Sequence, residues 1–214
     1  MRIAFLTLGC KVNSYETEKM KQQFEQAGHM VVSFEEPAEV YVVNTCTVTN
    51  IADRKSRKML HRAKRKSPGS IVVAAGCYVD SARKKGEQDA SVDLFLSNAD
   101  KERLVENVIR LWKEKNGTMD LFPERNRAAD SSADLTEQKS AERKEHMSEA
   151  AKQEEHTRAY LKVQNGCNQF CTYCIIPYVR GPLTSRPQEE VLTEVRALAE
   201  KGIQEVVVTG IHLS

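Results

Sequence analysis

The chain has 214 residues, of which 40% are hydrophobic and 29% are charged, and its formal net charge at pH 7 is +2. A chain of this length and composition can bury a sizeable core and can form more than one domain. No stretch approaches the roughly 18 to 20 consecutive apolar residues of a membrane span, and the first residues enter a predicted strand rather than a signal peptide. We therefore expect a cytoplasmic protein without a membrane partner.

Short apolar runs alternate with helical segments over residues 1–112. The runs lie at residues 3–9, 30–33, 40–44, 71–76 and 94–96. Continuous runs rich in β-branched residues are typical of buried strands in a parallel sheet. Strands that alternate with helices predict an α/β fold with a doubly wound, flavodoxin-like or Rossmann-like parallel sheet.

Polar capping residues predict where helices of this first domain begin. Ser14 can cap a helix that runs to about Gln26, Asp80 starts a charged helix, and Asp100 caps another. The last of these helices carries apolar residues at helical spacing, namely Leu104, Val105, Val108, Ile109 and Trp112. We expect the first domain to end at residue 112.

A basic segment on a predicted helix follows the third strand. Between residues 54 and 66 there are eight basic residues and no acidic one: Arg54, Lys55, Arg57, Lys58, Arg62, Lys64, Arg65 and Lys66. Such a group raises the local positive potential and can bind RNA phosphates through counterion release. The alternative is an ordinary solvated helix face. The candidate nucleic-acid contacts are Arg54, Lys55, Arg57, Lys58, Arg62 and Lys64.

Residues 113–156 lack the apolar pattern of the first domain. They are rich in charged and small polar residues, and large apolar side chains are scarce. A segment of this kind cannot bury enough apolar surface to offset its ordering entropy. We expect a charged flexible linker between two ordered regions.

An ordered pattern returns at residues 157–214. Residues 159–164 alternate between apolar and polar side chains and predict a strand, and residues 205–210 predict another. Between them Pro187 opens a helix that Gly202 ends. The expected inward stripe of this helix is Val191, Val195, Leu198 and Ala199.

Three cysteines in this second region have the spacing C-x3-C-x2-C. They are Cys167, Cys171 and Cys174. This spacing is typical of three thiolate ligands to a [4Fe-4S] cluster whose fourth iron has no protein ligand. Zinc sites favour C-x2-C pairs with further partners, and a thioredoxin-type C-x-x-C needs no third cysteine. The pattern favours an iron–sulfur site over zinc, a disulfide or inert thiols.

The other three cysteines each follow an apolar run in the first domain. They are Cys10, Cys46 and Cys77. Because the carboxyl ends of parallel strands meet at one edge of the sheet, we expect these cysteines to be neighbours in space. Buried structural cysteines, which act as small apolar residues, are the alternative. Disulfides are disfavoured for all six cysteines in a cytosolic protein.

Several segments resemble the methylthiotransferase family of radical S-adenosylmethionine (SAM) enzymes. They are residues 8–17 (LGCKVNSYET), 44–49 (NTCTVT), 76–78 (GCY), 166–181 and 185–187 (SRP). The GCKVN and CTYCIIPYVRG segments are most similar to the subfamily that acts on N6-threonylcarbamoyladenosine at position 37 of tRNA. The relatives that act on isopentenyladenosine or on a ribosomal protein aspartate resemble the chain less at these points.

The resemblance implies two [4Fe-4S] clusters and SAM as cofactors. Cys10, Cys46 and Cys77 would bind the first cluster, which carries the sulfur of the methylthio group. Cys167, Cys171 and Cys174 would bind the second, which cleaves SAM. Tyr173, Thr209 and Gly210 would lie near SAM. Arg180 and Arg186 would face the substrate or anchor the cluster loop, and an ordinary surface salt bridge is the alternative for each.

The same resemblance implies tRNA as the substrate and partner, with an electron donor such as a flavodoxin or ferredoxin and a sulfur source. It also implies that residues 157–214 are the beginning of a radical SAM partial (β/α) barrel. We therefore expect a truncated, inactive form of a methylthiotransferase. The alternatives are a methylthiotransferase for isopentenyladenosine-37, a non-enzymatic iron–sulfur protein, and a zinc-bound RNA-binding module.

Overall fold

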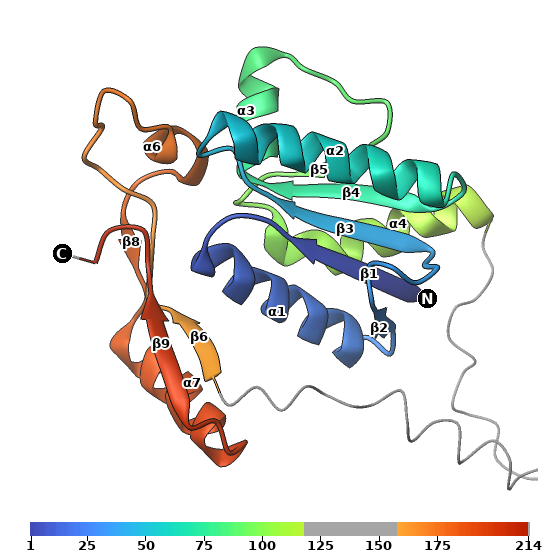
Figure 1. Ribbon diagram of the computed structural model, residues 1–214. Coiled ribbons are helices and arrows are strands. Elements are labelled where there is room, and N and C mark those ends of the chain that lie inside the picture. The colour runs from blue at the N-terminus through green and yellow to red at the C-terminus, as the bar shows by residue number, and fades with distance from the viewer. Residues whose placement is uncertain (118–157, 214) are drawn as a thin grey trace, which may run out of the picture.

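A five-stranded parallel sheet forms the first region of the computed structural model, which describes residues 1–117 and 158–213 (Figure 1). The strands are β1 (Arg2–Thr7), β2 (Met30–Val32), β3 (Val40–Thr45), β4 (Ile71–Gly76) and β5 (Leu94–Leu96). Their order is β2-β1-β3-β4-β5, and all pairs are parallel. This is the flavodoxin-like order, so the predicted α/β fold is confirmed.

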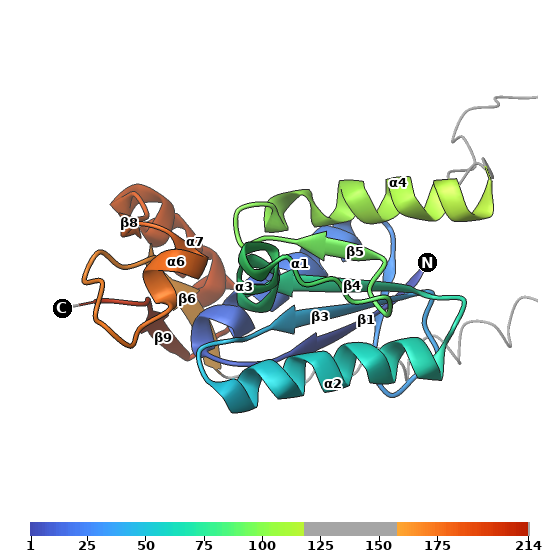
Figure 2. The ribbon, with the colours of Figure 1, turned by 90° about the horizontal axis from the view of Figure 1, so that it is seen from above.

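Helices cover both faces of this sheet (Figure 2). They are α1 (Lys11–Gln26), α2 (Asn50–Lys66), α3 (Cys77–Lys85) and α4 (Leu104–Asn116), which a short 3-10 helix (Lys101–Arg103) precedes. α2 and α3 contribute Leu60, Ala63 and Val79 to the core on one face, and α1 and α4 contribute Phe24 and Leu104 to the core on the other. The sheet is therefore doubly wound.

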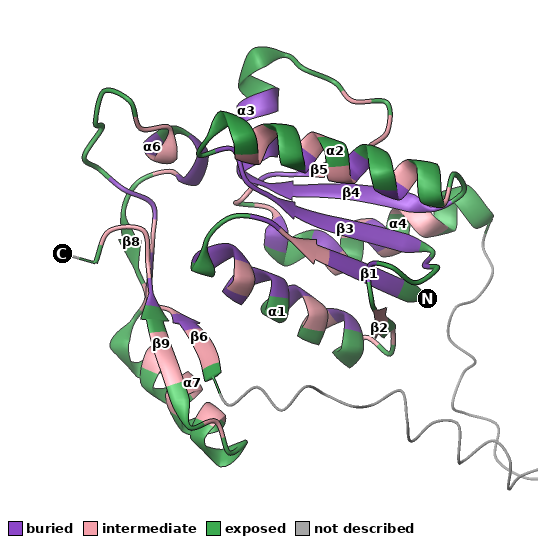
Figure 3. Cartoon of the chain, viewed as in Figure 1, coloured by how far each residue is buried: buried purple, intermediate pink, exposed green. Residues whose placement is uncertain are grey.

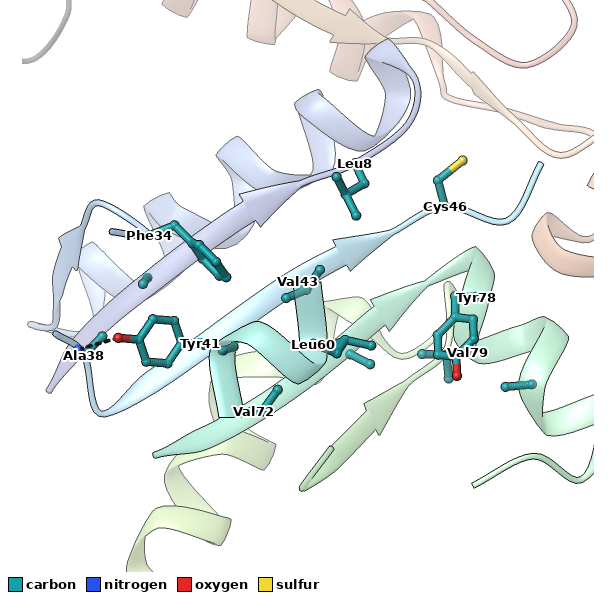
Figure 4. Close-up of a cluster of buried hydrophobic side chains, with 14 residues drawn as sticks. Leu8, Phe34, Ala38, Tyr41, Val43, Cys46, Leu60, Val72, Tyr78 and Val79 are labelled. Carbon is teal, nitrogen blue, oxygen red and sulfur yellow. Dashed lines mark hydrogen bonds between the residues drawn. The ribbon is translucent and has the colours of Figure 1, made fainter. Parts of the chain in front are cut away.

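The two central strands, β3 and β4, are buried along their whole length. Because both of their faces are covered, both faces are apolar, which explains the continuous apolar runs of the sequence. Figure 4 shows one of the two core clusters, in which Tyr41 packs at the start of β3. Its buried hydroxyl donates a hydrogen bond to the Glu36 carbonyl (2.9 Å) and accepts one from the Ala38 amide (3.1 Å).

Two helices begin earlier than the capping residues predict. α1 starts at Lys11 rather than Ser14, and α3 starts at Cys77 rather than Asp80. Both follow a strand almost directly, and the residue before α3 is Gly76, whose φ of 99° permits a turn that other residues rarely adopt. Neither helix has a side-chain cap, so a search for capping residues places their starts too late.

The other boundaries differ less from the prediction. The carboxyl group of Asp100 accepts a hydrogen bond from Ser97 rather than capping a helix. α4 continues to Asn116, beyond the predicted domain end at residue 112. The predicted linker, residues 113–156, lies outside the described residues from residue 118 onward.

The second region contains one parallel strand–helix–strand unit. β6 (Arg158–Lys162) pairs in parallel with β9 (Glu205–Thr209), and α7 (Gln188–Glu200) connects them. A small antiparallel pair, β7 (Gln164–Asn165) and β8 (Thr184–Ser185), and the short helix α6 (Ile176–Arg180) lie between β6 and α7. The sequence patterns predict the two main strands and α7 but not these shorter elements.

The predicted apolar stripe of α7 is only partly covered. Val191, Val195 and Leu198 are half-buried, whereas Ala199 is exposed, so its predicted inward position is wrong. No residue of α7 is buried, and Figure 3 shows this helix in the colours of intermediate and exposed residues beside β6 and β9. Instead, the second region contacts the first, with β6 against α1 and α6 against α3.

Candidate metal centre at the carboxyl edge of the sheet

Three cysteines follow three adjacent strands at the carboxyl edge of the sheet. Cys10 comes after β1, Cys46 after β3 and Cys77 after β4. Cys46 and Cys77 are buried, and Cys10 is exposed. A Cβ atom on Gly9 would lie 2.8 Å from the Cys46 sulfur, so the loops of Cys10 and Cys46 touch. The structure thus brings the three predicted residues to one edge, as parallel strands require.

All six cysteines are free thiols. In residues 1–117 and 158–213, no three His, Cys, Asp or Glu side chains converge on a position for a single metal ion. A cubane cluster offers a different iron to each cysteine, so its ligands need not converge on one point. The donor set at this edge, three thiols without imidazole, fits an iron–sulfur cluster.

Buried polar side chains fix the loops that carry these cysteines. The Asn13 amide donates to the carbonyl of Leu8 (2.6 Å) and to that of Thr45 (3.0 Å), the residues that precede the loops of Cys10 and Cys46. The Thr45 hydroxyl donates to the Ala75 carbonyl (2.6 Å) at the end of β4. The Ser56 hydroxyl accepts from the Cys46 amide (3.1 Å) and donates to the Cys46 carbonyl (2.8 Å). The three loops therefore form one hydrogen-bonded edge.

The sequence patterns do not predict these positioning residues. Asn13, Asn44 and Thr45 are all buried, although Asn is depleted in strands and Asn44 lies in β3. The Asn44 amide donates to the Asn13 carbonyl (2.9 Å) and to the Thr17 hydroxyl (3.0 Å). The sequence does carry one signal for them, which is the polar pair Asn44 and Thr45 at the end of the otherwise apolar strand β3.

A buried charge cluster lies beside this edge. The carboxylate of Glu16 on α1 accepts from Lys101 (2.5 Å), Lys162 on β6 (2.9 Å) and Arg180 on α6 (3.1 Å). Arg180 also donates to the side chain of Asn13. Arg180 is therefore not the surface salt bridge considered above, because its side chain is only 1% exposed.

The neighbouring charges in this cluster favour the ionised forms of Glu16 and Arg180. Burial opposes ionisation of Glu16, but the three cations around it hold the pKa of its carboxyl well below the usual range. Burial likewise opposes the charge of Arg180, but Glu16 and, to a smaller extent, the neighbouring Cys77 and Cys10 raise its pKa. Burial lowers the pKa of Lys101, against the attraction of Glu16.

The second cysteine set lies on the loop between β7 and α6. Cys167 is buried, Cys174 is half-buried and Cys171 is exposed. The Cys167 amide donates to the Gly181 carbonyl (3.2 Å), and the Cys174 amide donates to the Cys171 carbonyl (2.9 Å). Gly166, directly before the loop, has a φ of 68°, and a Cβ there would lie 2.0 Å from the Pro182 carbonyl oxygen. Only glycine fits this position.

The predicted SAM residues lie in two different settings. Tyr173 on the cysteine loop is 93% exposed, so it does not act as a packing residue. Thr209 ends β9 and is buried, and Gly210 follows it beside Gln164. The Gln164 side-chain oxygen accepts from the amides of Ile211 (2.7 Å) and His212 (2.9 Å), which fixes the chain after β9. An open apolar cavity of about 340 Å³ lies nearby, between the end of β6 and α7.

Arg186 connects the second region to α1. Its guanidinium donates to the Tyr15 hydroxyl (3.1 Å) and the Lys162 carbonyl (2.8 Å), and it pairs with Glu194 (2.8 Å). Burial and the charge of Glu194 raise the pKa of Tyr15. Of the roles expected for Arg186, the structure shows a salt bridge, which it forms with Glu194 of α7 inside the second region, while its hydrogen bond to Tyr15 reaches the first region.

The basic residues of α2 fall into two groups. Arg57 pairs with Asp53 (2.8 Å), Lys64 with Asp93 (2.8 Å), and both Arg62 (2.6 Å) and Lys66 (3.9 Å) with Glu35. Exposed side chains that form no ion pair within the described part of the chain are Arg54, Lys55, Lys58 and Arg65. These four retain the uncompensated positive charge that a phosphate contact needs.

Two family models match the two regions separately. Residues 2–97 match UPF0004, an uncharacterised protein family, and residues 161–212 match the radical SAM superfamily. The second match implies an iron–sulfur cluster and SAM. None of the helices in the described ranges is long and apolar enough to cross a membrane.

Curated relatives are similar along the whole chain. The threonylcarbamoyladenosine tRNA methylthiotransferase MtaB of Aquifex aeolicus is 40% identical over 100% of this chain and 48% of its own length. MtaB of Bacillus subtilis is 39% identical over 98% of this chain and 43% of its own length. A tRNA-2-methylthio-N(6)-dimethylallyladenosine synthase from Methylacidiphilum infernorum is 30% identical over 95% of this chain and 42% of its own length.

The chain spans less than half of the length of these relatives. Residues 2–97 match the UPF0004 family and residues 161–212 match the radical SAM superfamily, and together with the MtaB relatives these matches confirm the resemblance to radical SAM methylthiotransferases.

Proposed function

We propose that the chain is the cluster-binding part of a radical SAM methylthiotransferase that adds a methylthio group to C2 of N6-threonylcarbamoyladenosine at position 37 of tRNA. The observation that carries this proposal is the pair of three-thiol sets, one at the sheet edge and one on the loop before α6. The greater similarity to proteins named MtaB than to the dimethylallyladenosine synthase supports this substrate.

In this proposal each cysteine set holds one [4Fe-4S] cluster. Cys10, Cys46 and Cys77 bind the first, and Cys167, Cys171 and Cys174 bind the second. Clusters with an open iron, when bound, supply the one-electron chemistry that cleaves SAM and the site that delivers sulfur. The three-thiol donor sets and the surplus of buried positive charge beside the first set support this assignment.

The remaining residues bind and orient in this proposal. Tyr173 on the exposed loop offers its ring to the adenine of SAM, and Thr209 with Gly210 lies near the amino end of SAM. The first domain, which holds the first cluster, extends through α4 to Asn116 rather than ending at residue 112, and residues 157–214 begin the SAM domain.

The partners follow from the same reaction. The exposed basic residues of α2 contact tRNA phosphates, and Arg57, Arg62 and Lys64 contribute to the same positive surface. A flavodoxin or ferredoxin supplies electrons, a separate source supplies sulfur, and the reaction takes place in the cytoplasm. Residues 1–214 without the remainder of their relatives' length form no product from tRNA.

The decisive experiment measures tRNA nucleosides by mass spectrometry in cells that lack the gene. Loss of 2-methylthio-N6-threonylcarbamoyladenosine, with the unmethylthiolated nucleoside in its place, is the expected result. Loss of the methylthiolated isopentenyladenosine would instead assign the other substrate. Unchanged tRNA with an iron- and sulfide-containing protein would favour a non-enzymatic iron–sulfur protein, and zinc without sulfide would favour a zinc-bound module.

A further inference from the structure

The buried charge cluster at the carboxyl edge contains more cations than anions. Glu16 is the only carboxylate within ion-pair distance of Lys101, Lys162 and Arg180 among the described residues. Asp80 is also close enough to feel the charge of Lys101, but it hydrogen-bonds to Asn98 (2.8 Å). Even when Asp80 is counted, three cations face two carboxylates.

Surplus positive charge is costly where water is excluded. The side chains of Arg180 and Lys101 are 1% and 8% exposed. A buried cation requires a nearby anion, since desolvation otherwise outweighs its favourable contacts. The fold therefore leaves a place for negative charge next to these two side chains.

The first cysteine set lies beside these two side chains. A Cβ on Gly76, the residue before Cys77, would lie 3.2 Å from the Lys101 ammonium nitrogen. Arg180 donates to Asn13, whose amide holds the loops of Cys10 and Cys46. The Asn98 amide lies 3.6 Å from the Cys77 sulfur and donates to the carbonyl of Val179 (2.8 Å), the neighbour of Arg180.

We propose that Lys101 and Arg180 are positioning residues that compensate the negative charge of a thiolate-bound cluster at Cys10, Cys46 and Cys77, and thereby set its reduction potential. The inference rests on the proposed first cluster. Arg180 belongs to the radical SAM region, so a residue of one region adjusts the site of the other. Glu16 has the opposite effect, because its carboxylate cancels part of the positive charge.

Charge changes of opposite sign separate this role from a merely structural one. In the 214-residue chain, Cys167, Cys171 and Cys174 are replaced by Ala so that only the first site remains, and the protein is reconstituted anaerobically with iron and sulfide. The reduction potential is then measured by titration followed by electron paramagnetic resonance. We expect Arg180→Gln to lower the potential, since the reduced cluster carries one more negative charge, and Glu16→Gln to raise it.

Matched variants control for structural effects. Arg180→Lys keeps the positive charge but loses the guanidinium that donates to both Glu16 and Asn13, and we expect a reduction potential near that of the parent. Arg186→Gln removes another cation between the two regions, one that pairs with Glu194, and we expect no shift. Lys101→Met removes the second cation and should lower the potential, which keeps the test available if Arg180→Gln does not fold.

Three outcomes would overturn the inference. Shifts of the same sign in Glu16→Gln and Lys101→Met would show that loosened packing, not charge, sets the potential. An equal shift in Arg186→Gln and Arg180→Gln would remove the special role of Arg180. A parent that binds neither iron nor sulfide would overturn the first cluster itself and with it this inference, so the two failures are distinguishable.

Discussion

The two regions of the molecule support their cysteines in different ways. In the first region, β3 and β4 are wholly buried between helices, and hydrogen bonds from Asn13 and Thr45 join the ends of the strands. In the second region, no residue of α7 is buried, and Val208 of β9 is 54% exposed. The first site therefore rests on a packed core, whereas the second depends on a loop and on contacts to the first region.

We therefore expect the two candidate sites to have separable stabilities. A change in the second region should remove the second site and leave the first sheet folded. A change in the core of the first region should affect both sites, because α6 and β6 rest on α3 and α1.

The largest expected effect separates the two cysteine sets chemically. In the protein expressed from the complete gene, Cys171→Ala should remove one cluster and abolish SAM cleavage. Cys46→Ala should also remove one cluster but leave SAM cleavage largely intact and block sulfur insertion. Iron and sulfide analysis measures the number of clusters in each variant, and an assay of 5′-deoxyadenosine measures SAM cleavage. Identical behaviour of the two variants would contradict the division of roles.

Adding a single methyl group at Gly166 should disrupt the second cysteine site and leave the first site intact. Gly166→Ala places a Cβ 2.0 Å from the Pro182 oxygen, so the loop cannot keep its path, and we expect loss of the second cluster only. Gly28 has a similar φ of 77° with no atom within 4 Å, so Gly28→Ala should cost only about 1 kcal/mol. Iron content and circular dichroism test this pair, and an unfolded Gly166→Ala protein would contradict separable stabilities.

Truncation of a buried leucine should lower the free energy of unfolding more in the first region than truncation of a half-buried one in the second. Leu60 is fully buried under the sheet, so Leu60→Ala should lower the free energy of unfolding by about 3 kcal/mol. Leu198 on α7 is half-buried, so Leu198→Ala should cost less than about 1 kcal/mol. Trp112, the single tryptophan, packs against the core of the first region, so its fluorescence during urea unfolding follows that region, while far-UV circular dichroism follows both regions. Equal losses would mean that the two regions unfold as one unit.

The smallest expected effect concerns α2, on the surface of the first region. Neutralising Arg54, Lys55 and Lys58 should weaken tRNA binding and reduce the slope of log affinity against log salt by roughly 0.7 to 0.9 per lost phosphate contact. Neutralising the ion-paired set Arg57, Arg62 and Lys64 should change the slope less, because acidic partners already compensate these charges. Unchanged slopes in both sets would assign α2 to a solvated face.

The parallel sheet could be predicted because its strands are buried on both faces. The runs before Cys10, Cys46 and Cys77 are continuous and β-branched, and the meeting of their ends follows from the topology alone. Helix starts could not be placed as well, because α1 and α3 begin without side-chain caps. Capping residues can be recognised in the local sequence, but a helix that follows a strand almost directly has no such residue to mark its start.

The long-range partners of the site were beyond sequence reasoning. Glu16 and Arg180 are 164 residues apart, and only the packing of α6 against the first region brings them together. The same holds for Lys101, which reads as a surface lysine in a charged segment but is buried. Hydrophobic periodicity describes one strand or one helix at a time, so it does not reveal ion pairs between elements that are far apart in the sequence.

The position of Glu16 on α1 imposes a constraint on chain length as well as on residue type. α1 begins immediately after Cys10, and its first two turns carry Asn13, Tyr15 and Glu16, which all contact the second region. One residue inserted in these turns would rotate every later side chain by about 100° around the helix axis. Insertions should therefore be tolerated near the end of α1, whereas between Cys10 and Glu16 even a single added alanine would separate the two regions without altering any cysteine.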